Sequence, residues 1–344
     1  MKRLSALLLC LLLLAGCSSG GTGDTGVTED FFAMDTVMKI TAYDGDKDAV
    51  TAAVQEVNTL EALFSRTRTE SEISAVNAAS GSGKSIKVSE TTFSILDSAV
   101  AFSKRTGDAF DITIAPVMDA WGFTKGEYRV PSQEELDALL PLVDDSLLEM
   151  DSGTFSVCLP KPGMAIDLGA IAKGFTANRV LEVLAAHKVT SAIVNLGGNI
   201  SVLGTKTDGS DWRVAVRDPK DSESYVCVLT LTDKTLSTSG GYERYFEENG
   251  KTYHHIIDPK TGYPAETGLT SVTVVSSSGA TADALSTACF VLGEDKALEL
   301  WRSSSDFELV LVREDGKVLV TEGLEKDLDT QGGNNGYTFE IVRR

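Results

Sequence analysis

Residues 165–202 read AIDLGAIAKGFTANRVLEVLAAHKVTSAIVNLGGNISV, and the hydrophobic pattern changes part-way along this stretch. Apolar residues recur with a helical period from Ala170 to His187, which predicts a helix. From Ser191 to Val202 the pattern becomes that of strands around a glycine turn, and the chain stays mostly strand-like as far as Val275. Helices mixed with runs of strand hairpins predict an α+β fold with mainly antiparallel sheets, not a doubly wound parallel sheet.

The same reasoning places elements on both sides of this stretch. On the N-terminal side it predicts one strand over 31–43, helices over 47–64 and 91–104, and an acidic helical segment over 130–148. Strands follow over 212–216, 225–231, 242–246 and 251–257, with hairpin turns at Asp208-Gly209 and Asn249-Gly250. The last elements are helices over 281–292 and 296–301 and strands over 307–312 and 317–320, joined by an Asp315-Gly316 hairpin. No linker divides these elements, so we expect one domain with two lobes over residues 29–344.

The N-terminus has the pattern of a secretion signal. Lys2 and Arg3 precede a twelve-residue apolar run, which is too short to span a bilayer. The run ends in Leu14-Ala15-Gly16-Cys17, which resembles a bacterial lipobox and implies removal of residues 1–16 and a lipid on Cys17. An ordinary signal peptide with an incidental cysteine is the alternative. Residues 17–28 then form a flexible tether, and the expected location is extracytoplasmic, lipid-anchored to the cell membrane.

Composition limits the classes of partner. The 344 residues carry a formal charge of −19, which argues against a protein that wraps nucleic acid. Only three histidines are present, which excludes a histidine-rich zinc or di-iron centre and favours a hard cation held by oxygens. The three cysteines beyond the anchor, Cys158, Cys227 and Cys289, lie in apolar runs and are expected to be buried free thiols. A Cys158–Cys227 bridge is the alternative.

A strand-to-helix junction is the first candidate site. An apolar strand ends at Asp167, Gly169 follows, and a helix begins, with Lys173 within about its first turn. Free N–H groups at a helix start attract anions, and a lysine there could neutralise a phosphate charge. A tight turn with a solvated lysine explains the same residues.

A carboxylate and a hydroxyl on one helix face form the second candidate. Asp283 and Thr287 are four residues apart, so both can point at one spot. This pair suits Mg²⁺, which takes few protein ligands. Helix capping by Asp283 is the alternative.

The third and fourth candidates lie in a strand end and a loop. His254 and His255 precede Asp258 and a turn with Pro259, and histidine near aspartate is a usual general-base arrangement. Neighbours in a strand face opposite ways, so only one histidine can enter a site; a turn with surface histidines is the alternative. Residues 106–111 could offer backbone groups and the Phe110 ring to an aromatic ligand.

Taken together, these segments resemble one family. The motifs, in order, are Met34-Asp35-Thr36, Ser71-Glu72-Ile73-Ser74 with Asn77, Gly107–Asp111, Ile166–Gly174, Asn195–Asn199, Thr238-Ser239-Gly240, His255–Pro259 with Gly262, and Asp283–Thr287. They are similar to those of the ApbE family, the FAD:protein FMN transferases, from about Met34 to about Gly293.

The resemblance implies an α+β fold in which FAD is held in a cleft beside a Mg²⁺ site. It also implies transfer of FMN from FAD to a threonine or serine hydroxyl of an extracytoplasmic redox-complex subunit, with release of AMP. By the same resemblance, the metal ligands are Asp283, Thr287 and the Ala170 carbonyl. The flavin contacts are Met34, Ala109, Phe110, Asp111, Asp167, Lys173 and Ile257. His255 is the base for the acceptor hydroxyl, and Asp258 either orients it or holds the Pro259 turn.

Three positions depart from the family pattern, and two other functions use the same residues. Asp35 replaces a usual glycine, Thr67 stands near a position that is often aromatic, and Ile112 replaces a proline. An FAD hydrolase that makes FMN and AMP would use the same site, and a flavin-binding lipoprotein would bind FAD without splitting it. Residues 278–281 resemble the core of an acceptor motif, and we interpret them as structural.

Overall fold

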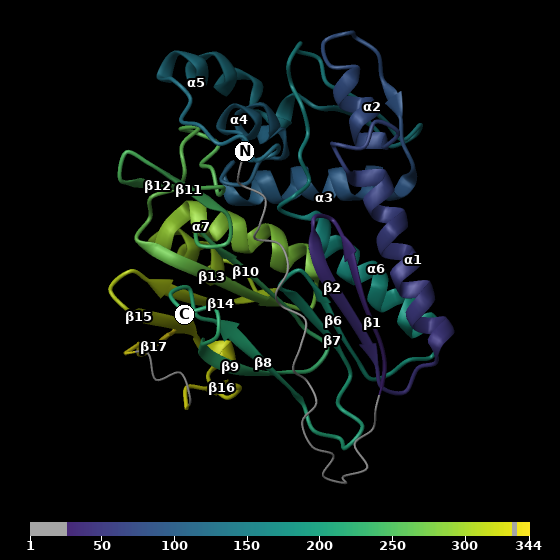
Figure 1. The fold of residues 1–344 in the computed structure, drawn as a ribbon, viewed down its shortest axis with the longest axis vertical. Coiled ribbons are helices and arrows are strands. Elements are labelled where there is room, and N and C mark those ends of the chain that lie inside the picture. Colours follow the sequence, from purple (N-terminus) through teal and green to yellow (C-terminus); the bar gives the residue numbers. More distant parts are fainter. Residues whose placement is uncertain (1–25, 332–335) are drawn as a thin grey trace, which may run out of the picture.

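A nine-stranded sheet runs through the computed structural model, which describes residues 26–331 and 336–344 (Figure 1). Its spatial order is β1-β2-β6-β7-β10-β13-β14-β15-β17. The strands are β1 Val27–Ala33, β2 Thr36–Ala42, β6 Ala192–Leu196, β7 Asn199–Leu203, β10 Thr235–Gly240, β13 Leu269–Ser276, β14 Phe307–Arg313, β15 Lys317–Thr321 and β17 Thr338–Val342. All neighbours are antiparallel except β15 and β17, which confirms the mainly antiparallel α+β expectation.

Three smaller sheets stand beside the large one. They are β16-β9-β8, β3-β5-β4 and the hairpin β11-β12. Their strands are β3 Ile86–Lys87, β4 Glu149–Asp151, β5 Ser156–Cys158, β8 Trp212–Arg217, β9 Tyr225–Leu231, β11 Tyr245–Glu248, β12 Lys251–His254 and β16 Leu328–Asp329.

Helices cover the large sheet and build the upper part of the molecule in Figure 1. They are α1 Lys47–Phe64, α2 Glu72–Ala78, α3 Glu90–Thr106, α4 Ala115–Trp121, α5 Gln133–Leu139, α6 Ala172–Ala186 and α7 Gly279–Arg302. Helix α7 packs on β10, β13 and α6, and α6 packs in turn on α1. This arrangement brings the starts of α6 and α7 together beside β10, where the site described below lies.

The strand expected over 31–43 is a hairpin of two strands. Strands β1 and β2 pair from Val27↔Ala42 to Ala33↔Thr36, and Met34 and Asp35 form the turn. Both turn residues have positive φ, 48° and 59°, as a two-residue hairpin turn of type I′ requires. Aspartate tolerates this conformation better than most residues, so the turn accommodates Asp35 where the family usually has glycine. Strand β1 also begins at Val27, inside the expected tether.

Two other expectations about elements were wrong. The acidic segment over 130–148 holds only the short helix α5, followed by two 3₁₀ turns, because Pro141 cannot donate the next helical hydrogen bond. The Asp208-Gly209 turn joins β7 and β8, which belong to different sheets, so it closes no hairpin. The Asn249-Gly250 and Asp315-Gly316 hairpins are confirmed as β11-β12 and β14-β15.

The cysteine expectation is confirmed, because Cys158, Cys227 and Cys289 are buried free thiols. Across residues 26–331 and 336–344, no helix has the length and hydropathy needed to cross a membrane. The expected signal peptide, residues 1–16, and Cys17 lie outside the described residues.

Candidate active site

Two glycines let α6 and α7 touch backbone to backbone. A Cβ atom at Gly174 would lie 2.1 Å from the Gly279 carbonyl oxygen, and one at Gly279 would lie 2.3 Å from that of Gly174. This close approach allows the Gly174 N–H to donate to Asp283 Oδ2 at 2.8 Å. The N-cap of α7 is Ser278, whose Oγ accepts from Thr281 N, so Asp283 does not cap its own helix. Residues 278–281 thus have the structural role expected of them.

Oxygen atoms gather around Asp283, whose side chain is almost fully buried. Ser237 Oγ on β10 lies 3.3 Å from Asp283 Oδ1. Thr287 Oγ1 is 3.2 Å from Ser239 Oγ, two residues further along β10. The Lys173 ammonium lies 3.9 Å from Asp283 Oδ1 and donates to the Gly169 carbonyl at 3.5 Å. Lysine, carboxylate and hydroxyls therefore converge where α6, α7 and β10 meet.

The donor set at this place fits a hard cation. Every ligand candidate offers oxygen: the Asp283 carboxylate, the Thr287 hydroxyl and the carbonyl of Ala170, which lies in the turn before α6. The Lys173 ammonium already brings one positive charge to these oxygens, between Asp283 and the Gly169 carbonyl. Among the described residues, no three His, Cys, Asp or Glu side chains are grouped as metal ligands. A cation held here would use few side-chain ligands, as Mg²⁺ does.

The two histidines have different surroundings. His254 Nε2 lies 3.1 Å from the Ala265 carbonyl, its Nδ1 accepts from Ile256 N, and its ring packs edge-on against Phe290. His255 Nδ1 lies 3.1 Å from the Arg244 carbonyl. A carbonyl can only accept, so Nδ1 of His255 carries the proton and Nε2 keeps a free lone pair. His254 has the opposite tautomer, with both nitrogens occupied.

The His255 ring is neutral at ordinary pH. Burial, and then the nearby Arg244 charge, lower the pKa of His255 to about 4. Lys173 also lowers this pKa, which links the histidine electrostatically to the Asp283 group. A neutral imidazole with a free Nε2 is able to accept a proton.

Asp258 holds the turn and does not contact the His255 Nδ1 proton, which goes to Arg244. Asp258 Oδ1 accepts from Lys260 N at 2.9 Å, and its carbonyl accepts from Thr261 N and Gly262 N. Of the two roles left open for Asp258, the structure supports the turn. The catalytic role expected of Asp258 stays a prediction.

An aromatic cluster lies beside His255, and the sequence pattern did not predict it. Phe123 meets the His255 ring edge-on, with ring centroids 6.4 Å apart. Phe123 also contacts Trp121, Phe246 and Tyr128. The members come from α4, the loop after it and the β11-β12 hairpin, so only the tertiary fold brings them together.

Two expected flavin contacts are partly exposed and well fixed. Asp167 Oδ1 accepts from Gly169 N at 2.7 Å, and its Oδ2 pairs with Arg66 at 3.2 Å. Met34, in the β1-β2 turn, donates its N–H to Glu61 Oε1 at 3.0 Å. Arg66 was missed from the sequence because it stands in an irregular loop, where hydrophobic periodicity gives no signal.

Four other expected flavin contacts are buried in the protein. Ala109, Phe110, Asp111 and Ile257 are each less than a tenth exposed. The Phe110 ring is buried and packs edge-on against Phe102, with ring centroids 6.5 Å apart. Asp111 accepts from Thr113 and from Asp145 N, and burial raises its pKa. Contact with a ligand here would involve the backbone of the loop.

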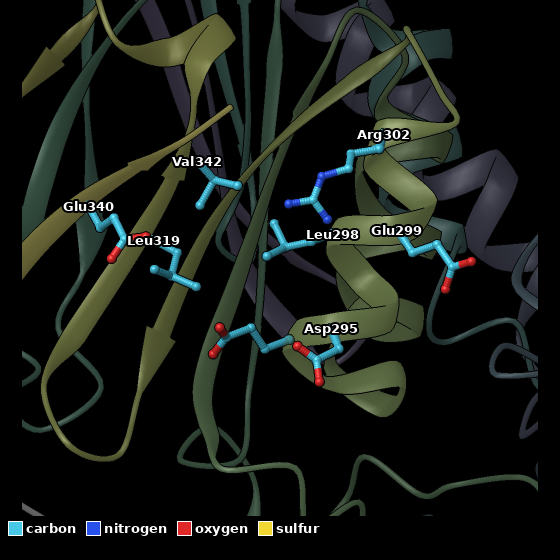
Figure 2. A pocket seen from close by; sticks show the side chains of 8 residues that line it. Asp295, Leu298, Glu299, Arg302, Leu319, Glu340 and Val342 are labelled. Atoms are coloured by element: carbon cyan, nitrogen blue, oxygen red, sulfur yellow. The ribbon is translucent and has the colours of Figure 1, made fainter. Parts of the chain in front are cut away.

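A hollow of about 540 Å³ lies elsewhere, between the second half of α7 and strands β15 and β17 (Figure 2). It is lined by four carboxylates and Arg302, together with the apolar side chains of Leu298, Leu319 and Val342. None of the expected site residues lines it, so the candidate site is defined by its side chains and not by this hollow.

Known proteins are similar to this chain in sequence and in fold. The ApbE family model covers residues 34–311. The chain belongs to the ApbE family. It is 34% identical over 336 residues to the FAD:protein FMN transferase of Treponema pallidum, with 92% of each chain covered. The enzyme of the same name from Klebsiella pneumoniae is 34% identical over 280 residues, covering 81% of this chain and 86% of the relative.

Solved structures of ApbE proteins have the same fold. The crystal structure of the ApbE protein of Thermotoga maritima superposes with a TM-score of 0.81 at 32% identity, covering 88% of this chain and 99% of that one. The flavin transferase ApbE of Vibrio cholerae gives a TM-score of 0.79 at 28% identity, covering 88% and 98%. The α+β, ApbE-like fold expected from the motifs is confirmed, and the matched region contains every expected site residue from Met34 onward.

Proposed function

We propose that this chain is an FAD:protein FMN transferase. It would move FMN from FAD to a threonine or serine hydroxyl of another protein and release AMP. The observation that carries the proposal is the free Nε2 of neutral His255, which is coupled to the Lys173–Asp283 group. Similarity to relatives that are named for this reaction supports it.

The chemistry requires what these residues offer. A threonine hydroxyl is a weak nucleophile, so a base must take its proton near the transition state, and His255 Nε2 is available for that task. The Lys173 ammonium, 3.9 Å from Asp283 Oδ1, would neutralise charge on the pyrophosphate of FAD in an otherwise acidic protein. In-line displacement at the phosphorus next to riboflavin places the incoming hydroxyl opposite the departing AMP.

We infer that Mg²⁺ assists this reaction and is held by Asp283, Thr287 and the Ala170 carbonyl. When bound, it would supply charge stabilisation on the phosphate oxygens. Asp283→Ala removes the only carboxylate of the set, so AMP release should collapse even where FAD still binds. The measurement is AMP release from FAD with Mg²⁺, against wild type and against wild type in excess EDTA. Equal turnover of wild type with and without EDTA would contradict a metal-assisted reaction.

The acceptor that we propose is an extracytoplasmic subunit of a membrane redox complex. The test is incubation of the domain with FAD, Mg²⁺ and candidate subunits, following AMP and protein-bound flavin fluorescence in gels. Flavin fixed to the acceptor, with AMP in equal amount, is the expected result. AMP and free FMN, with no labelled acceptor, would instead identify a hydrolase. Binding of FAD with no AMP would identify a flavin-binding protein.

We propose a location outside the cytoplasm, on the membrane surface, with a lipid on Cys17. The support is the charged start, short apolar run and Leu14–Cys17 pattern of the sequence.

A further inference from the structure

Arg66 is a charged side chain withdrawn from solvent. It lies between α1 and α2, and its side chain is only 13% exposed. A guanidinium that leaves water needs anionic or polar partners to offset its lost hydration. Arg68, two residues on, is 48% exposed and pairs only loosely, with Glu61 at 3.5 Å. The two arginines of one loop are therefore in different situations.

The Arg66 guanidinium joins three separate parts of the chain. Nη1 donates to Asp167 Oδ2 at 3.2 Å and to Thr124 Oγ1 at 2.8 Å. Nη2 donates to Asp119 Oδ2 at 2.6 Å. Asp167 precedes α6, Asp119 is on α4, and Thr124 is in the loop after α4. The planar, forked arrangement of donors is what permits three partners at once, which a lysine cannot match.

The backbone that carries Arg66 is itself fixed. The Ser65 carbonyl accepts from the hydroxyls of Ser71 and Ser74 at the start of α2. Ser65 N donates to the Glu61 carbonyl at 3.0 Å, which continues the end of α1. The arginine is thus presented from a rigid loop.

Asp167 is held from two other directions. Gly169 N donates to its Oδ1 at 2.7 Å. The Asn77 side chain clamps the preceding residue, accepting from Ile166 N at 2.7 Å and donating to the Ile166 carbonyl at 3.0 Å. Arg66 supplies the remaining restraint, on Oδ2.

We propose that Arg66 is a positioning residue, which fixes the Asp167 carboxylate for FAD. This inference rests on the proposed function, in which Asp167 contacts the flavin substrate. Restraining a contact group before the ligand arrives lowers the cost of ordering it on binding. The same guanidinium holds Thr124 through Nη1 and Asp119 through Nη2, on either side of Phe123, the residue that packs against His255. One side chain therefore connects the flavin side of the site to the base.

The experiment is a double-mutant cycle on FAD binding. The dissociation constant of FAD is measured by flavin fluorescence for wild type, Arg66→Gln, Asp167→Asn and the double variant. We expect each single variant to bind FAD about tenfold more weakly, the usual effect of losing a charge-assisted hydrogen bond. The double variant should be little worse than either single one, because both remove the same restraint. Arg68→Gln is the matched control and should bind FAD like wild type.

Arg66→Lys covers the case in which the glutamine variant fails to fold. It keeps the charge but can satisfy only part of the network, so its affinity should fall between wild type and Arg66→Gln. Three results would overturn the inference. They are wild-type affinity for FAD in Arg66→Gln, wild-type affinity for FAD in Asp167→Asn, and fully additive losses of affinity in the double variant. The readout is FAD binding alone, so it does not depend on flavin transfer. If the cycle shows coupling but no acceptor protein receives flavin, the proposed function is contradicted and the positioning role of Arg66 is retained.

Discussion

The adjacent residues His254 and His255 have opposite tautomers and different roles. His254 uses both ring nitrogens within the protein, whereas His255 uses only Nδ1. The sequence predicted that only one of the pair could enter a site. The family resemblance selected His255, and the structure adds the tautomer, because the carbonyl beside His255 Nδ1 is that of Arg244, eleven residues away.

Replacing the two histidines should therefore have different consequences. His255→Ala should slow flavin transfer by roughly 10²–10⁴-fold with little change in FAD affinity, since it removes a general base. His254→Ala should lower the free energy of unfolding by about 1–3 kcal/mol, because buried polar groups lose their partner. Transfer rates and denaturant unfolding of both variants provide the measurement. A fully active His255→Ala enzyme would show that another group takes the proton.

The pH dependence of transfer follows from the lowered pKa of His255. The ring acts as a base only when neutral, so its contribution should be constant above about pH 5 and fall as the pH drops through about 4. The unfolded chain takes up this proton near 6.5, so acidification between 6.5 and 4 also removes stability. Single-turnover transfer rates across this range provide the test, restricted to pH values at which the protein stays folded. A titration near 6.5 that is absent in His255→Gln would show that burial does not lower this pKa.

At the scale of elements, the crossing of α6 and α7 fixes where Asp283 stands. Gly174→Ala places a methyl group 2.1 Å from the Gly279 carbonyl oxygen, so the helices must separate. We expect a loss of about 1–3 kcal/mol in stability and a marked loss of AMP release, because the Gly174–Asp283 hydrogen bond is broken. Thermal unfolding and FAD cleavage measure the two effects. Gly153→Ala is the control, since its Cβ would meet only Asp151 Oδ1 at 3.2 Å; equal effects of both substitutions would argue against the crossing as the cause.

Elements with a strong period were predictable, and those set by tertiary contacts were not. The helix over 47–64 matches α1 residue for residue, because its apolar stripe and its Asp46 cap both act locally. The β1-β2 turn was missed because Met34 and Asp35 carry no glycine signal for positive φ. Strands β10 and β13 lie inside the region expected to be β, but their pairing in the large sheet depends on partners distant in sequence.

The candidate site likewise contains residues that the sequence predicted and residues that it did not. Asp283, Thr287 and Lys173 were found from local spacing and from family motifs, and the structure brings them together. Ser237 and Arg66 act through contacts that span tens of residues, so no local pattern could indicate them. The contact of Phe110 with Phe102 likewise depends on the fold, and the ligand contact expected of Phe110 stays a prediction.

At the scale of the whole molecule, the proposed lipid on Cys17 would set the position of the domain relative to the membrane. Cys17→Ala should move the protein from the membrane fraction to the soluble fraction, because the lipid attachment point is lost. Fractionation of cells that express each form, followed by immunoblotting, checks this. Unchanged partitioning of the variant would contradict the lipid anchor. Transfer activity measured in solution should be the same for both forms, since the site lies within the described domain.

The aromatic cluster beside His255 also has an optical consequence. Trp121 belongs to it, donating its indole N–H to the Gly262 carbonyl and stacking near Phe123. The other two tryptophans, Trp212 and Trp301, belong to separate groups of the core. Ile257, an expected flavin contact, belongs to the same apolar group as Trp121. A flavin bound beside Ile257 would accept excitation energy from Trp121, so FAD binding would then be seen as a loss of tryptophan emission without an added label.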